Sequence, residues 1–402
     1  MLKLRPFSCI LILVAALYIE PWAPAAAARK ELPVVAALCD ALEAQLGVRP
    51  AYRKVKKAKD GTVTIRGLTT EVEQSQSVEK KVKGTLSIEG VTLAGVSEDA
   101  SGQFDVAEVT LSNLIFISDE DAEISSALRV PEVKISHLYL KTNNAAAISG
   151  GWVLPLEMQA LRLEAEKAML SSGGLSLEIG SIAASWMIDP DTGVGRTDLK
   201  VQDIHYPASA IRRSDPTGVV LALIGGGDLV FDLLGTTMLG SDGGVFEAAL
   251  TMRSLGTLQI TGKLAGRLPS LLASAPTVSQ SDAELPTPAA SPIMISGITL
   301  RYEDMSLTGK LLALLARDQG VAMDRLIENA ASAVATGVGQ DSEDELFSQV
   351  TSAVKAYLGA PKSFTVASDL PQPVTVQAFI ESIAQGPAEF FARYPASVSV
   401  ND

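Results

Sequence analysis

An eight-residue pattern that recurs along the first half of the chain constrains the fold more than any other feature. Apolar residues stand at its first, third, sixth and eighth positions, and seven copies follow one another at intervals of 21 to 24 residues, with Thr70 and Ala184 as the weak positions. The copies occupy residues 63–70, 86–93, 109–116, 133–140, 156–163, 177–184 and 199–206. Such a period indicates a repeat architecture, in which each unit buries its apolar side only against its neighbours.

Each copy predicts one long strand with an interruption at its middle. Apolar residues alternate at period two on both sides of a two-residue step, which is typical of a strand with one covered face. One extra residue at the step, as in a bulge, keeps both halves facing the same way. We therefore expect a mainly β fold with C-terminal helices (α+β). Its long antiparallel strands should form a repeat sheet that is curved into a trough or a sandwich.

Composition changes along the chain suggest five segments. Residues 1–28 resemble a signal peptide, 29–60 an N-terminal helix and a basic connector, and 61–267 the repeat sheet. Residues 268–292 are rich in Pro, Ser and Ala and predict a linker or an insertion between strands. Residues 293–402 predict a returning strand and a helical cap, including a strand at 363–367 and a helix from 374 to 383.

The first segment has the form of a secretory signal. Lys3 and Arg5 precede an apolar run at 7–19 and a small-residue stretch at 25–28. The run has 13 residues, whereas spanning a bilayer takes about 20. We expect cleavage and export to the periplasm, with an uncleaved membrane anchor as the alternative. Cleavage leaves Cys39 as the one cysteine, so no intramolecular disulfide is expected.

The sequence offers little material for catalysis. The two histidines, His137 and His205, occupy unlike positions in their copies and are interpreted as strand-surface residues. Zinc-protease, nucleophile-elbow and Walker A motifs and paired cysteines do not occur. We therefore expect no enzyme, no metal and no cofactor. A hydrolase that uses two carboxylates, such as Glu178 with Asp203, is a third alternative.

Long repeated strands behind a signal, followed by helices, resemble the AsmA-like and related β-groove lipid-transfer proteins of the bacterial envelope. They also resemble uncharacterised secreted repeat-β proteins of Gram-negative bacteria. The resemblance covers residues 61–302 and is one of pattern. It implies a non-enzymatic protein that binds or carries a lipid acyl chain in an apolar groove. The groove residues would be Leu111, Phe116, Ile135, Leu140, Leu161, Leu163, Ile179 and Ile204.

The same apolar rows also fit a structural or interaction protein of the envelope, whose core is filled by its own helices. An envelope protein that adds to an exposed sheet edge is a second candidate partner besides a hydrophobic small molecule. Nucleic acid is not an expected partner, because the net charge of −13 repels phosphate.

Overall fold

The computed structural model describes most of the chain and divides it into two compact units. Described are residues 31–46, 48–77, 80–100, 102–118, 126–141, 160–173, 175–189, 192, 194–215, 217–240, 243–265, 294–338, 345–375, 378–379, 381–382, 393–394 and 396–402. The first unit lies within residues 1–191 and 198–210, and the second within 192–197 and 211–402. The expected signal peptide at 1–28 falls outside the described residues.

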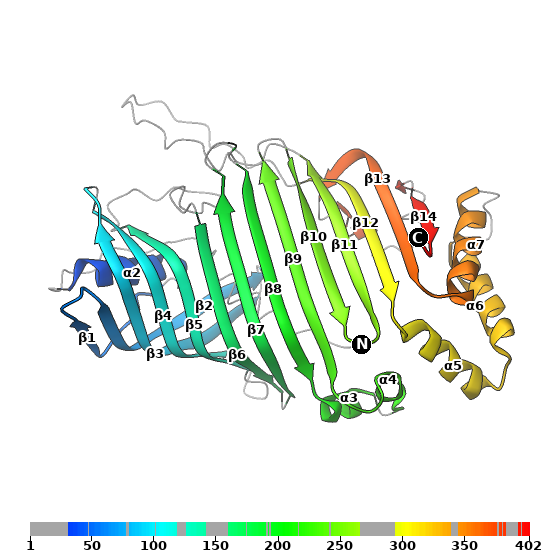
Figure 1. The fold of residues 1–402 in the computed structure, drawn as a ribbon, viewed down its shortest axis with the longest axis horizontal. Coiled ribbons are helices and arrows are strands. Elements are labelled where there is room, and N and C mark those ends of the chain that lie inside the picture. Colours follow the sequence, from blue (N-terminus) through cyan, green and yellow to red (C-terminus); the bar gives the residue numbers. More distant parts are fainter. Residues whose placement is uncertain are drawn as a thin grey trace. The chain divides into compact units, whose positions relative to one another are not determined.

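Within the described residues, the first unit contains helix α2 and antiparallel strands, most of them long, that lie in the sheet in the order of the chain (Figure 1). Its elements are α2 (Pro33–Leu46), β1 (Lys54–Lys57), β2 (Val63–Ser77), β3 (Lys80–Glu98), β4 (Gln103–Ser118), β5 (Ser126–Lys141), β6 (Ala160–Ser172), β7 (Leu175–Ile188) and β8 (Gly195–Tyr206). Six of the seven predicted copies fall within six different strands, which confirms the mainly β prediction and its long antiparallel strands.

The predicted steps exist, and many hold a residue in the left-handed conformation. The second step residue has a positive φ in β2, β4, β5 and β8, at Gly67, Asn113, His137 and Asp203, with values of 50° to 65°. Strand pairing continues across the step without a change of register, since Arg66 pairs with Gly90 and Leu68 with Ile88. Both paired strands carry the extra residue at the same position along the sheet, so the steps are aligned and the pairing register is kept.

One step lies elsewhere than expected. In β6 the left-handed residue is Lys167, with a φ of 55°, and the buried residues around it are Leu163, Ala165, Ala168 and Leu170. The sequence placed this copy seven residues earlier, at 156–163. The two alanines explain the difference, because their apolar signal is weaker than that of the leucines upstream.

Helix α2 lies on the apolar side of the first unit. Its main contacts with strands are to β2 and β5, although β3 and β4 lie between these two. A helix about 10 Å wide on a flat sheet would contact the strands between as closely. The sheet of this unit therefore bends around the helix, as the trough prediction required. The basic stretch after the helix, expected to be a connector, instead forms the edge strand β1, which pairs with β2.

The second unit contains the remaining strands and most of the helices. Its elements are α3 (Ala208–Ser214), which begins at the end of the first unit, α4 (Val219–Leu223), β9 (Leu229–Gly240), β10 (Gly243–Met252), β11 (Gly256–Ala265), β12 (Met294–Asp304), α5 (Leu307–Gln319), α6 (Met323–Val338), α7 (Glu345–Gly359), β13 (Ser363–Thr375) and β14 (Ser397–Val400). β11 and β12 pair with each other, so the segment between them is an insertion between neighbouring strands.

The C-terminal helices form their own group. α5 packs on α6 and α6 on α7, while α7 contacts β14. The helix expected from Val374 is wrong at its start, because Val374 and Thr375 still pair with β12 as part of β13. Among the described helices, none has the length and apolar character needed to cross a bilayer.

Candidate functional site

The eight residues proposed as a groove floor all lie in strands of the first unit, on its apolar face. Six of them have less than a tenth of their surface exposed, and Leu111 and Leu161 are half-buried. The buried six are Phe116, Ile135, Leu140, Leu163, Ile179 and Ile204. Because these side chains are already out of water, a ligand there would have to replace contacts that they make with other parts of the protein.

A second apolar face, in the second unit, is less covered. The register of β9 to β13 aligns its side chains in rows that cross the strands. We call these residues the apolar face. One row is Leu233, Leu250, Leu258, Tyr302 and Phe364; the next is Gly235, Ala248, Ile260, Leu300 and Val366; the third includes Phe246, Gly262 and Ile298.

The exposure of this face differs from that of the first unit. Apart from Gly262, its residues are half-buried or exposed, and Leu300 near its middle is 42% exposed. The opposite side of the same strands is dominated by threonines and charged residues, although Leu234, Met238 and Val245 are exposed there on β9 and β10. A row of large aliphatic side chains at this exposure is unusual for a finished core.

Aromatic rings lie flat on this face. A Cβ added at Gly262 would meet the Phe246 ring at 2.0 Å, and one at Gly256 would meet the Tyr302 hydroxyl at 2.5 Å. The glycines therefore leave room for rings from the neighbouring strands. Burial raises the pKa of Tyr302, and its hydroxyl donates to Asp304 at 3.0 Å, so this phenol stays protonated.

Two aromatic contacts cover the ends of the face on the side of β12 and β13. At one end Phe379 and Tyr394 pack with Ile295 and Leu370 in a buried cluster. At the other end the Tyr357 ring of α7 meets Phe364 edge-on, with ring centroids 5.6 Å apart. Leu300 lies between these two covered ends and has the highest exposure in its row.

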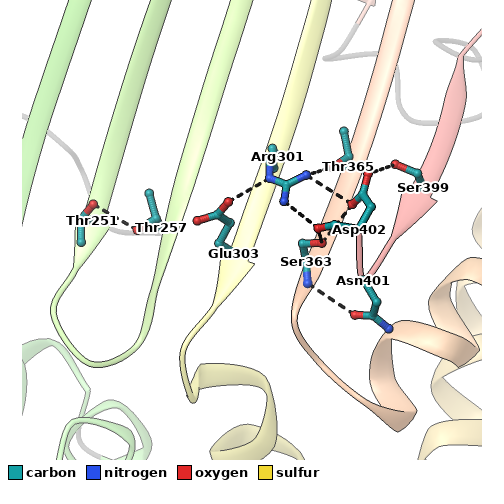
Figure 2. Close-up of polar contacts among 9 residues, drawn as sticks. All are labelled: Thr251, Thr257, Arg301, Glu303, Ser363, Thr365, Ser399, Asn401 and Asp402. Atoms are coloured by element: carbon teal, nitrogen blue, oxygen red, sulfur yellow. Dashed lines mark hydrogen bonds and ion pairs between the residues drawn. The ribbon is translucent and has the colours of Figure 1, made fainter.

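A polar cluster on the opposite side of β12 to β14 fixes the last strand (Figure 2). Arg301 donates to Asp402 at 3.2 Å and to Glu303 at 3.0 Å, and Ser363 and Ser399 donate to the Asp402 carboxylate at 3.0 Å each. The hydrogen bonds from Ser399 and Ser363 lower the pKa of Asp402. Since these groups bind one another, the cluster holds β14 against β13 and β12. We call Arg301, Ser363, Ser399 and Asp402 the latch.

Neither outer strand offers a plain edge for another strand. At one edge β1 carries Lys54, Lys56 and Lys57. At the other edge β14 has four residues and contacts α7, and the part of β13 beyond its pairing with β14 carries Pro371 and Pro373. Charged side chains and prolines are how sheets avoid strand addition. Pairing through an edge, one of the two partner predictions, stays a prediction.

Other candidates from the sequence lie on the strands of the first unit. His137 is exposed at the step of β5, and Glu178 is exposed on β7. Asp203 lies at the step of β8, where its Cβ faces Gly180. Within the described residues, no group of His, Cys, Asp and Glu has the arrangement of a metal site.

Comparison with known proteins gives a partial match. A family model described as an uncharacterized protein matches residues 249–401, less than half of the chain. A search of curated proteins finds no match. The matched region begins in β10 and ends just after β14, so it contains most of the apolar face, and its description assigns no activity. The sequence predicts strands here, including a returning strand after residue 292, but the exposure of their apolar side depends on contacts that residue types do not show.

Proposed function

We propose that this protein binds a lipid acyl chain on the apolar face of its second unit and catalyses no reaction. The observation that supports the proposal is the row Ile260, Leu300 and Val366, whose side chains remain partly in water on three neighbouring strands. Burying one CH₂ group is worth about 0.8 kcal/mol. A 16-carbon chain therefore offers on the order of 10 kcal/mol before the cost of association is subtracted.

The polar surroundings fit a passive role. Arg301 and Asp402 lie on the opposite side of the strands and are paired, and Asp304, at the end of the face, accepts hydrogen bonds from the Tyr302 hydroxyl and the Thr308 N–H. Export through the expected signal would place such a carrier in the envelope, and sequencing the N-terminus of protein from the periplasmic fraction tests that part of the proposal.

The test is native mass spectrometry with lipid extraction on protein purified without detergent. We expect acyl lipid in near-stoichiometric amount. Leu300→Asp should remove most of it, because a carboxylate in the central row opposes acyl-chain burial. Thr299→Asp is the matched control, since the neighbouring residue points to the other side of β12.

The outcomes separate the alternatives. A clean apo mass, with no uptake of palmitate on incubation, would refute lipid binding and leave a structural envelope protein. The buried apolar side chains around α2 favour a structural role, since the first unit already fills its own interior. Loss of lipid in Leu111→Gln but not in Leu300→Asp would place the ligand in the first unit instead.

A further inference from the structure

Helix α4 is apolar on every side, and none of its residues is buried. Its five residues are Val-Val-Leu-Ala-Leu. Val219 and Val220 are 36% and 38% exposed. Ile224 follows, half-buried, and then the exposed glycines 225–227, which have open space around them. We call residues 219–227 the apolar finger; it follows α3 in the chain, and its helix α4 lies beside α3 in Figure 1.

The finger is held in a defined conformation by local hydrogen bonds. The Asp215 carboxylate accepts from the backbone N–H of Val220 at 2.7 Å and from the Thr217 hydroxyl, and these two bonds lower its pKa. The chain then turns back, because Gly226 N–H donates to the carbonyl of Leu221 at 2.7 Å. Gly225 and Gly226 have φ values of 76° and 82°, which suit glycine. The exposure of the valines therefore belongs to a built turn.

The neighbourhood adds further exposed apolar groups and positive charge. α4 contacts α5, where Leu311 is exposed, and Met305 just before α5 is 59% exposed. Arg212 in the last turn of α3 is exposed, in a chain whose net charge is −13. An exposed basic side chain beside exposed aliphatic ones matches an anionic membrane surface, in which a guanidinium group binds lipid phosphate.

We propose that the apolar finger inserts into the headgroup region of a lipid bilayer. A protein partner would cover one side of a helix, whereas a helix that is apolar all round is immersed in a core or a membrane. Five residues cannot span a bilayer, so the insertion is shallow. This inference does not require the proposed acyl-chain site, although β9 begins at Leu229, two residues beyond the finger, and would bring that site close to the membrane.

Pelleting with sucrose-loaded vesicles of phosphatidylethanolamine and phosphatidylglycerol (3:1) tests the inference on the full-length protein. The double variant Val219→Asp, Val220→Asp should lower the partition coefficient at least tenfold. Val334→Asp on α6 is the matched control, because Val334 is 37% exposed and also lies on a helix. We expect this control to stay within twofold of the unchanged protein. Equal binding by the double variant and the unchanged protein, or no binding by either, would overturn the inference.

A probe reports insertion directly. With Cys9→Ser, a Val220→Cys variant labelled with the environment-sensitive dye NBD should brighten severalfold and shift to the blue on adding vesicles. The same label at Val334→Cys should not change. Cys39 is buried and stays unlabelled. A label at 220 that remains in water contradicts insertion. If the double variant instead changes the oligomeric state while vesicle binding is unaffected, the finger is a contact between two copies and the membrane proposal fails.

Discussion

Replacing Gly180 by alanine tests how the steps of neighbouring strands fit together. A Cβ at this position of β7 would lie 2.7 Å from the Cβ of Asp203 on β8, well inside ordinary van der Waals contact. Asp203 cannot turn away, because its Cβ is attached to a backbone held at a φ of 55°. Overpacking against such an atom costs roughly 1–3 kcal/mol. Replacing a strand glycine by alanine raises the free energy of unfolding by about 0.5–1 kcal/mol, so we expect a net destabilisation of about 1–2 kcal/mol.

The sign should reverse when Asp203 is also changed. Asp203→Gly removes the Cβ that would clash and suits the left-handed conformation. In that background Gly180→Ala is expected to stabilise the protein by about 0.5–1 kcal/mol, since only the gain in strand propensity remains. The double-mutant cycle should therefore give a coupling of about 1–3 kcal/mol between the two positions.

Urea unfolding followed by the fluorescence of Trp186 measures this coupling. Trp186 is buried on β7 itself, and Trp22→Phe and Trp152→Phe remove the other two tryptophans. The first unit then reports its own transition, which avoids treating the whole chain as one cooperative system. A coupling below about 0.5 kcal/mol, or stabilisation by Gly180→Ala in both backgrounds, would show that the steps of β7 and β8 do not face each other.

Two further predictions follow from the pKa shifts. Burial and the nearby Glu31 raise the pKa of Cys39 to about 11. The folded protein is therefore stabilised below the unfolded pKa near 9, and its free energy of unfolding falls by up to about 2–3 kcal/mol as pH rises to 11. Urea titrations of Cys39→Ala should lack this loss, and equal alkaline sensitivity of both proteins contradicts the assignment. The lowered pKa of Asp402 means that the latch on β14 is complete above about pH 4 and fails as pH falls further. At pH 7, Arg301→Gln should speed hydrogen exchange in β14 severalfold, whereas Arg317→Gln on α5 should leave it unchanged. An unchanged exchange rate of β14 in Arg301→Gln would reject the latch.

The sequence predicted the first unit well because its strands follow a strong period. The positions of Leu68, Leu114 and Ile204 after their steps could be inferred, since alternation resumes there with the opposite phase. It could not show which step residue adopts the left-handed conformation, because glycine, asparagine, histidine, lysine and aspartate all occur there. Nor could it show that α2 would fill the bend, since that depends on contacts between residues far apart in the chain.

The second unit was harder to predict, for physical reasons that particular residues show. β13 extends to Thr375 through Pro371 and Pro373, which argued against a strand when considered alone. Pairing of Val374 with Ile295 overrides that local preference. The finger was visible only as an apolar stretch broken by glycines, and its exposure cannot be read from residue types.

The contrast between the two units suggests where function is to be sought. Across the described parts of β9 to β13 the only residue with a positive φ is Gly243, the first of β10, and the register shifts lie together, between Lys263 and Leu264 and between Ile295 and Gly297. In the first unit the steps add local bends, and the apolar side chains of its strands are buried around α2. Over the rest of these strands the alternation runs without left-handed residues, and most side chains of the apolar face stay half-buried or exposed. We therefore expect the proposed ligand on this face, where Leu300 is 42% exposed, and not around α2, where the apolar side chains are already buried.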